Sequence, residues 1–202
     1  MQTAQQHNSI SSTSAIAYVN KLVAASKPFI RINGANRLDW CRVMTKPTDP
    51  RIGPWHYCPD YQVLDESVWN QLGEVLYFVT DAQNQVRLVG ESAKKLKDRW
   101  RTSPMFDTKT FEPLGKKSLF HSTAWPAIEA GFDRGDSSQF TLLAIFRPEL
   151  QKQCASMGGP FLALLEKPET DLKRLAYHVE QWVCSLSNQG LNLWNKQGVK
   201  RK

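Results

Sequence analysis

Short apolar blocks separated by polar turns run along most of the chain, and the clearest pair lies near its middle. Val75–Thr80 and Val86–Val89 are rich in β-branched and aromatic residues, and the polar residues 81–85 separate them. This alternation of apolar blocks and a polar turn predicts a β-hairpin. The basic segment that follows, Ala93–Arg101, predicts a helix, and Ser92 is suited to cap its N-terminus.

Further elements are expected in the last third of the chain. Phe140–Phe146 is almost wholly apolar and predicts a third strand, whereas Ser122–Ala130 is compatible with a helix. Residues 102–118 are polar and contain two prolines, which is typical of a loop. The most regular helical pattern is Leu172–Leu186, whose apolar residues fall on one stripe: Leu172, Leu175, Ala176, Val179, Val183 and Leu186.

The first 74 residues give weaker signals. Residues 1–14 are polar and predict a flexible tail. The remaining expectations are a helix at Ala15–Ala25, strands at Phe29–Ile32 and Trp40–Met44 with a turn at Asn33–Asn36 between them, a loop at residues 46–60, and a helix within Val63–Leu72.

Composition indicates a folded protein with a polyanionic partner. The hydrophobic share of 41% and the seven tryptophans allow a core, and no apolar run reaches the roughly 20 residues of a membrane span. We therefore expect a soluble cytoplasmic protein. Residues 1–74 contain 7 Lys/Arg and 6 Asp/Glu, whereas residues 75–202 contain 19 and 13. Clustered cations gain affinity for nucleic acid by releasing its counterions, so the basic half favours a nucleic-acid partner over mere solubility. The four cysteines lack paired spacing, which favours free thiols over a zinc site.

Several residues in the second half have side chains suited to phosphate chemistry. Glu180 lies at the edge of the apolar stripe of its predicted helix, and Asn192 follows it by twelve residues. One carboxylate with a nearby amide suits a single Mg²⁺, because Mg²⁺ takes few protein ligands and completes its shell with phosphate and water. Arg99 flanks the buried side of its helix and can pair with a phosphate. In isolation each of these residues is more often structural.

Two further side chains could position or deprotonate water. Tyr77 stands among apolar neighbours in the first strand of the hairpin, and His121 follows an apolar pair. Either could instead be a packed core residue, although the usual pKa of histidine suits proton transfer near neutrality. Cations around Arg99 are expected to bind the nucleic-acid backbone: Lys94, Lys95, Lys97 and Arg101.

Taken in order, these residues resemble the GIY-YIG nuclease superfamily over residues 74–196. Val75-Leu76-Tyr77 stands for the first motif, Leu88-Val89-Gly90 for the second, and Gly90-Glu91-Ser92 with Leu96-x-x-Arg99 for the run that follows. The chain departs from the pattern at three places. Val75 replaces a glycine, Leu88 replaces a tyrosine, and His121 lies farther from Arg99 than is usual.

The resemblance implies an α+β fold with a small, three-stranded, mainly antiparallel sheet flanked by helices. In this organisation residues 1–14 are a tail and residues 15–73 an N-terminal extension for target recognition or interaction. Residues 74–196 form the nuclease core, with an insertion at residues 102–138, and residues 197–202 are a basic tail.

The implied function is a Mg²⁺-dependent DNA endonuclease of restriction or mobile-element type that leaves 5′-phosphate and 3′-hydroxyl ends. Mn²⁺ is expected to substitute for Mg²⁺, duplex DNA is the expected partner, and cutting both strands calls for a homodimer or two successive nicks. The resemblance assigns catalysis to Tyr77, Arg99, His121, Glu180 and Asn192, with Glu180 holding the metal. Two alternatives stay open: a catalytically inactive nucleic-acid-binding module on the same fold, for which Leu88 argues, and a protein that binds acidic partners.

Overall fold

The computed structural model describes residues 12–38, 56–100, 124–158, 161, 165 and 175–195. These residues form an α+β fold around one five-stranded sheet with the strand order β2-β1-β5-β3-β4, in which all neighbouring strands are antiparallel. The strands are β1 (Lys27–Leu38), β2 (His56–Val63), β3 (Val75–Thr80), β4 (Val86–Ser92) and β5 (Phe140–Phe146). The helices are α1 (Ser12–Ala25), α2 (Glu66–Asn70), α3 (Leu96–Arg99), α4 (Ala124–Asp133), α5 (Arg147–Met157) and α8 (Leu175–Ser185), with a 3₁₀ turn at Leu186–Asn188.

The predicted three-stranded sheet is wrong, because two strands from residues 15–73 extend it. β1 pairs with β5 from Lys27 opposite Ala144 to Ile32 opposite Phe140, and β2 pairs with the outer side of β1. Without β1, the apolar strand β5 would lie at an edge and leave its peptide groups unpaired. The two edge strands of the five-stranded sheet are instead β2 and β4, and both carry polar residues.

The turn expected at Asn33–Asn36 is also absent, since β1 runs through these residues as one strand. A register shift between Ile32 and Gly34 marks a β-bulge at this place. A bulge admits an extra residue without ending the pairing, so a turn-like sequence can lie inside a strand. Trp40–Met44, the other strand expected in this region, lies outside the described residues.

The hairpin of β3 and β4 agrees with the sequence pattern, and one buried carboxylate organises its turn. Asp81 is 2% exposed, and its Oδ1 accepts hydrogen bonds from the backbone N–H groups of Gln83 and Gln85. The other oxygen of Asp81 accepts a hydrogen bond from Arg87 Nε at 2.8 Å. The guanidinium of Arg87 therefore stabilises the turn through its ion pair with Asp81.

The helices differ from expectation in length and number. α3 is a single turn, because Ser92 belongs to β4 and its hydroxyl accepts the N–H of Lys94 in a tight turn before the helix begins. α5 follows β5 directly and was not expected, whereas α4 and α8 fall within or close to their predicted ranges. No helix in the described part of the chain is both long and apolar enough to cross a membrane.

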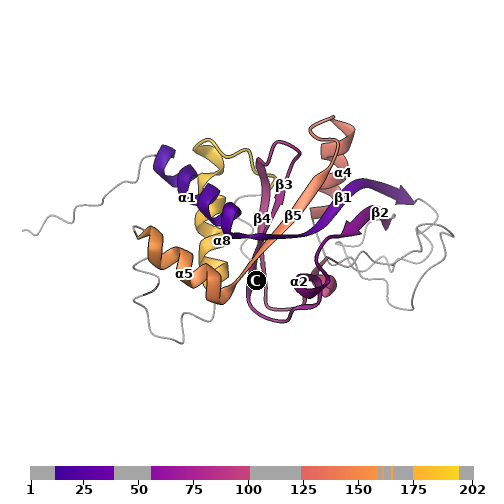
Figure 1. The fold of residues 1–202 in the computed structure, drawn as a ribbon. Helices are drawn as coiled ribbons and strands as arrows, with labels where there is room; N and C mark the ends of the chain where they lie inside the picture. The colour runs from indigo at the N-terminus through magenta and orange to yellow at the C-terminus, as the bar shows by residue number, and fades with distance from the viewer. Residues whose placement is uncertain are drawn as a thin grey trace, which may run out of the picture.

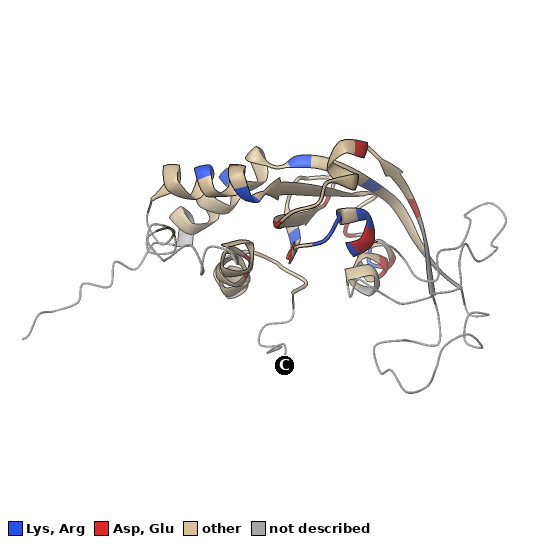
Figure 2. Ribbon diagram, turned by 90° about the horizontal axis from the view of Figure 1, so that it is seen from below, with Lys and Arg blue, Asp and Glu red and all other residues tan. Residues whose placement is uncertain are grey.

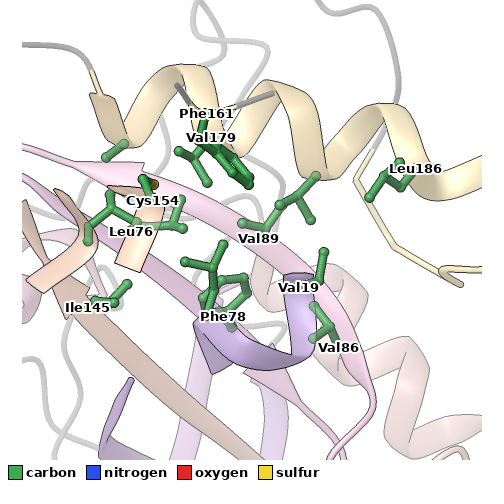
Figure 3. Packing of buried hydrophobic residues seen from close by; sticks show 14 of the residues in the cluster. Val19, Leu76, Phe78, Val86, Val89, Ile145, Cys154, Phe161, Val179 and Leu186 are labelled. Atoms are coloured by element: carbon green, nitrogen blue, oxygen red, sulfur yellow. The ribbon is translucent and has the colours of Figure 1, made fainter. Parts of the chain in front are cut away.

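The sheet separates two apolar clusters, and Figure 1 shows the helices of each gathered on opposite sides. We call the first the aliphatic face: Leu76, Phe78, Val89 and Ile145 pack against α1, α5 and α8, and these side chains converge in Figure 3. We call the second the aromatic face, where β-strand residues pack against α2, α3 and α4; it contains Phe29, Tyr77, Trp100, Trp125 and Phe140.

Candidate functional site

The candidate site begins where Tyr77 crosses the outermost strand. Tyr77 on β3 lies directly opposite Gly90 on β4 and is 2% exposed. A Cβ atom placed on Gly90 would lie 2.7 Å from Cε2 of Tyr77 and still closer to Cζ and Oη, nearer than packed atoms approach. Only glycine therefore fits at position 90 while the phenol lies over β4. This contact directs the hydroxyl of Tyr77 toward the edge of the sheet.

Arg99, at the end of α3, meets this hydroxyl. Its Nε donates a hydrogen bond to Oη of Tyr77 at 3.1 Å, and its guanidinium carbon lies 5.8 Å from the ring centroid. The neighbouring residues Leu96 and Trp100 are buried and hold the short helix in place. Trp100 packs edge-on against Tyr77 at 5.3 Å and against Trp125 at 5.8 Å. Arg99 itself is half-buried, so its side chain connects the buried phenol with the surface.

Glu180 approaches the same phenol from α8, which lies along β4 and β3. It is only 6% exposed, because Val179 and Val183 beside it are packed into the aliphatic face. Burial is the main cause that raises the pKa of Tyr77; Arg99 opposes this shift, whereas the negative charges of Glu180 and Glu91 add to it. The negative charge of Glu180 on α8 therefore lies near enough to affect the phenol.

The same carboxylate also acts on Cys184, one helical turn farther along α8. Burial raises the pKa of the Cys184 thiol to about 11, and the charge of Glu180 contributes to this shift. The thiol is therefore protonated at neutral pH and is not a nucleophile.

The structure brings together four of the residues on which the resemblance was based: Tyr77, Gly90, Arg99 and Glu180. We call them the Tyr77 cluster. They come from β3, β4, α3 and α8. His121 and Arg101 lie outside the described residues, so their predicted roles remain predictions.

Asn192 does not join the cluster in the described structure. Its side chain is exposed, and no hydrogen bond among the described residues connects it to Glu180. Asn195, three residues later, is the asparagine that reaches the sheet. Its Oδ1 accepts the N–H of Val89 at 3.0 Å, and its Nδ2 donates to the carbonyl of Val89 at 2.8 Å.

Asn195 was missed because its role depends on a meeting of distant segments. A carboxamide offers the same donor and acceptor as a peptide group, so it can pair with an edge strand as another strand would. The backbone N–H of Trp194 adds a hydrogen bond to the carbonyl of Arg87. Together these bonds fasten the segment after α8 to β4, directly beside Gly90. Nothing in the local sequence distinguishes Asn195 from Asn192.

Basic residues precede and surround Arg99 on α3. Lys94 is exposed, and Lys95 and Lys97 are half-buried, so all three can present their ammonium groups to solvent. Figure 2 shows basic positions on several elements, with the stretch that leads into α3 among them. Leu88, which replaces the second tyrosine of the resemblance, is partly buried and packs against the aromatic face.

The ligand set of the cluster suits Mg²⁺ better than a metal that requires many protein ligands. Among the described residues, no group of three or more His, Cys, Asp or Glu side chains could hold a metal ion. Glu180 offers one nearly buried carboxylate, which matches the single protein ligand that Mg²⁺ accepts when phosphate and water complete its shell. One Mg²⁺ ion with Glu180 as its protein ligand, and with phosphate and water as the others, would be compatible with this set.

Comparison with known proteins adds no relative to this picture. No known family model, curated protein or solved structure matches the chain.

Proposed function

We propose that this chain is a Mg²⁺-dependent endonuclease that hydrolyses phosphodiester bonds in duplex DNA, as its resemblance to the GIY-YIG superfamily implies. The observation that carries the proposal is the hydrogen bond from Arg99 to the hydroxyl of Tyr77 above Gly90, on a phenol whose pKa also responds to Glu180. The arginine, the carboxylate and the phenol come from three elements, α3, α8 and β3, of which α8 is distant in sequence from the other two. A purely structural tyrosine requires neither charged group.

Arg99 is suited to bind the scissile phosphate. Its guanidinium stays charged and can neutralise the negative charge that develops on the phosphate oxygens in the transition state. The hydrogen bond to Tyr77 uses Nε, and the N–H groups of the two terminal nitrogens have the fork geometry that matches phosphate oxygens. Lys94, Lys95 and Lys97 lie on the approach to Arg99 and are proposed to bind neighbouring phosphates.

Tyr77 is suited to orient the attacking water rather than to deprotonate it. Because its pKa is raised above the ordinary value of 10.0, the phenol is protonated at neutral pH. Its oxygen already accepts a hydrogen bond from Arg99, so its proton remains available for donation to a water or phosphate oxygen. Proton acceptance from the water is proposed for His121, which lies outside the described residues.

Glu180 would hold the Mg²⁺ ion, which when bound supplies Lewis-acid stabilisation of the phosphate and the leaving oxygen. The burial of Glu180 strengthens its interaction with a cation, because few water molecules compete with the carboxylate. The proposed products are 5′-phosphate and 3′-hydroxyl ends. Cleavage of both strands by one cluster per chain would proceed through a homodimer or two nicks.

A plasmid-cleavage assay tests this proposal. Supercoiled DNA is incubated with the protein and Mg²⁺ or Mn²⁺, beside the variants Glu180→Gln and Arg99→Ala. Each substitution is expected to reduce cutting by roughly 10²-fold or more, since each removes charge that stabilises the transition state. Glu149→Gln and Arg134→Ala are matched controls, because both change ion-paired residues outside the cluster. Cutting that survives Glu180→Gln would show that the site is wrong.

Leu88 favours a second candidate, a module that binds nucleic acid without cutting it. Leu88 contributes an apolar side chain to the aromatic face where the resemblance places a tyrosine hydroxyl. In this case the wild-type chain would bind duplex DNA in an anisotropy assay with no products at any metal concentration. Lys94→Ala and Lys97→Ala should each lower the salt dependence of binding by about one counterion in either case.

A further inference from the structure

Glu74 joins three elements at the end of the sheet nearest the first turn of α8. It precedes β3 directly, and its backbone carbonyl accepts the N–H of Arg147, the first residue of α5. One carboxylate oxygen forms an ion pair with the guanidinium of Arg147 at 3.4 Å. The other accepts the backbone N–H of Ala176 at 2.7 Å.

The contact with Ala176 connects a side chain on the sheet to the first turn of a helix. Backbone N–H groups in the first turn have no acceptor within their own helix, and the helix dipole favours a negative charge beside them. A carboxylate is therefore well matched to this place, and its hydrogen bond is charge-assisted. Glu74 thereby fastens the start of α8 to the start of β3.

Both fastened points lie close to the Tyr77 cluster. Tyr77 follows Glu74 by three residues along the extended strand, and Glu180 follows Ala176 by four residues, one helical turn, on the same side of α8. The position of the Tyr77 phenol relative to the Glu180 carboxylate thus depends on the hydrogen bond between Glu74 and Ala176, which connects the start of β3 with the start of α8. The bonds of Asn195 to Val89 fasten the other end of this region.

The charge of Glu74 is partly buried, and the structure compensates for it. Its side chain is 13% exposed. Burial raises the pKa of Glu74, the N–H of Ala176 and the charge of Arg147 lower it, and the neighbouring Glu91 raises it further. Partial removal of this charge from water costs stability, and such a cost is typical of a residue that fixes the positions of its neighbours.

We infer that Glu74 is a positioning residue: through Ala176 it holds α8 so that Glu180 faces Tyr77. The inference rests on the proposed function for its catalytic consequence. Glu74 itself touches neither the phosphate nor the metal in this scheme. It acts through the placement of Glu180, and small displacements of reacting groups reduce rates strongly.

Two measurements by NMR test the placement independently of cleavage. In Glu74→Ala, the amide of Ala176 should exchange with solvent at least about tenfold faster, because it loses its acceptor, while amides within β3 such as that of Phe78 keep their protection. The ¹³Cζ resonance of Tyr77 should shift, because its phenol responds to the charge of Glu180. Glu149→Gln on α5 is the matched control and should change neither signal.

Cleavage kinetics test the catalytic consequence. Glu74→Ala should lower kcat by roughly tenfold with KM within about twofold, because the DNA-binding cations are unaffected. Glu74→Gln keeps an acceptor for Ala176 and guards against misfolding of the alanine variant, so a smaller loss is expected. In the Glu180→Gln background, Glu74→Ala should cause no further loss.

Each outcome decides the inference. Unchanged Ala176 exchange and an unchanged Tyr77 resonance would overturn it, as would an active enzyme whose kcat does not respond to Glu74→Ala. If the wild-type chain does not cut DNA, the proposed function fails, and the two NMR signals alone decide whether Glu74 positions Glu180. Changes in both NMR signals together with the loss in kcat would support the inference in full.

Discussion

The two faces of the sheet differ in what β3 contributes to each. Leu76 and Phe78 point into the aliphatic face, whose buried members are hydrocarbon side chains together with Cys154 and Met157. Tyr77, between them in sequence, points into the aromatic face beside Trp100. Alternate side chains of β3 therefore point to opposite faces: one set packs in an apolar core, and the other lies in a cluster with charged neighbours.

This difference shows where polar chemistry can be accommodated in a small fold. A charge within the aliphatic face would lack compensation, whereas the phenol of Tyr77 reaches the sheet edge above Gly90 and meets Arg99 there. Glu180 belongs to a helix of the aliphatic face, but it acts on the phenol of the other face. The Tyr77 cluster therefore lies at the boundary between the faces, and variants on each face should have different effects.

The largest expected effect is on stability, from a substitution in the aliphatic face. Phe78→Ala should lower the free energy of unfolding by about 3–5 kcal/mol, because Phe78 is fully buried and its loss leaves a cavity. Chemical denaturation followed by tryptophan fluorescence measures this change. Leu72→Ala is the control, since Leu72 is 68% exposed and should change stability little. A loss below about 1 kcal/mol would contradict the assignment of Phe78 to a packed core.

Gly90→Ala should disturb the aromatic face and leave the aliphatic face intact, because the added methyl group lies on the aromatic side of β4. The added methyl group would collide with the ring of Tyr77, so the phenol must move away from Arg99. Overpacking of this kind costs about 1–3 kcal/mol, and cleavage should fall by roughly 10²-fold because Tyr77 and Arg99 separate. Both effects are measurable by denaturation and the plasmid assay.

Gly34→Ala provides the control for this prediction. Among the residues that the structure describes, a Cβ atom at Gly34 would meet only Cβ of Asp60 at 3.8 Å, an ordinary contact, so the methyl group fits. Stability and cleavage should both stay close to the wild type. Equal losses in Gly34→Ala and Gly90→Ala would indicate a general intolerance of alanine in the strands and not a specific contact with Tyr77.

Tyr77→Phe sharpens the comparison by removing only the hydroxyl. The ring keeps its packing against Trp100, so stability should change by no more than about 1 kcal/mol. Cleavage should fall by roughly 10²-fold if the hydroxyl orients water. Tyr18→Phe on α1, whose ring packs edge-on against Phe161, is the control and should retain full activity. Full activity of Tyr77→Phe would assign Tyr77 to packing alone.

The smallest expected effect is on the alkaline pH dependence of stability. Because the folded-state pKa of Tyr77 is raised, the unfolded chain loses the phenol proton first, from about pH 10 upward. The contribution of Tyr77 is therefore complete below pH 10 and is lost as the pH rises toward its folded-state pKa. The free energy of unfolding, measured by denaturation at a series of pH values in this range, should fall less steeply with pH for Tyr77→Phe than for the wild type. Identical slopes would show that the phenol does not titrate in this way.

The elements predicted from sequence were those whose pattern is local. The hairpin Val75–Ser92 follows from two apolar blocks and a polar turn, and the stripe on Leu172–Leu186 predicted most of α8. The short length of α3 and the uninterrupted course of β1 were not foreseen. Ser92 could begin a helix or end a strand, and Gly34 could form a turn or a bulge. In both cases the pairing of the surrounding sheet decides between the two.

The residues of the candidate site divide in the same way. Tyr77, Arg99 and Glu180 were singled out by residue type and order, whereas the pairing of Asn195 with β4 carried no signal in the sequence. Glu74 carried no signal, because a glutamate before a strand is common. Its importance follows only from its contacts with Ala176 and Arg147, which lie 102 and 73 residues away along the chain.

By itself the sequence determined the alternation along β3, the residue types of the Tyr77 cluster and their order, because these depend on periodicity and side-chain chemistry. The tertiary structure alone decided that β1 completes the sheet beside β5, that Gly90 makes room for the phenol, and that Glu180 acts on it from the opposite face. These outcomes depend on contacts between residues far apart in sequence. Such contacts form because unpaired strand edges and unpacked apolar faces are costly, and no local pattern records which distant segment will cover them.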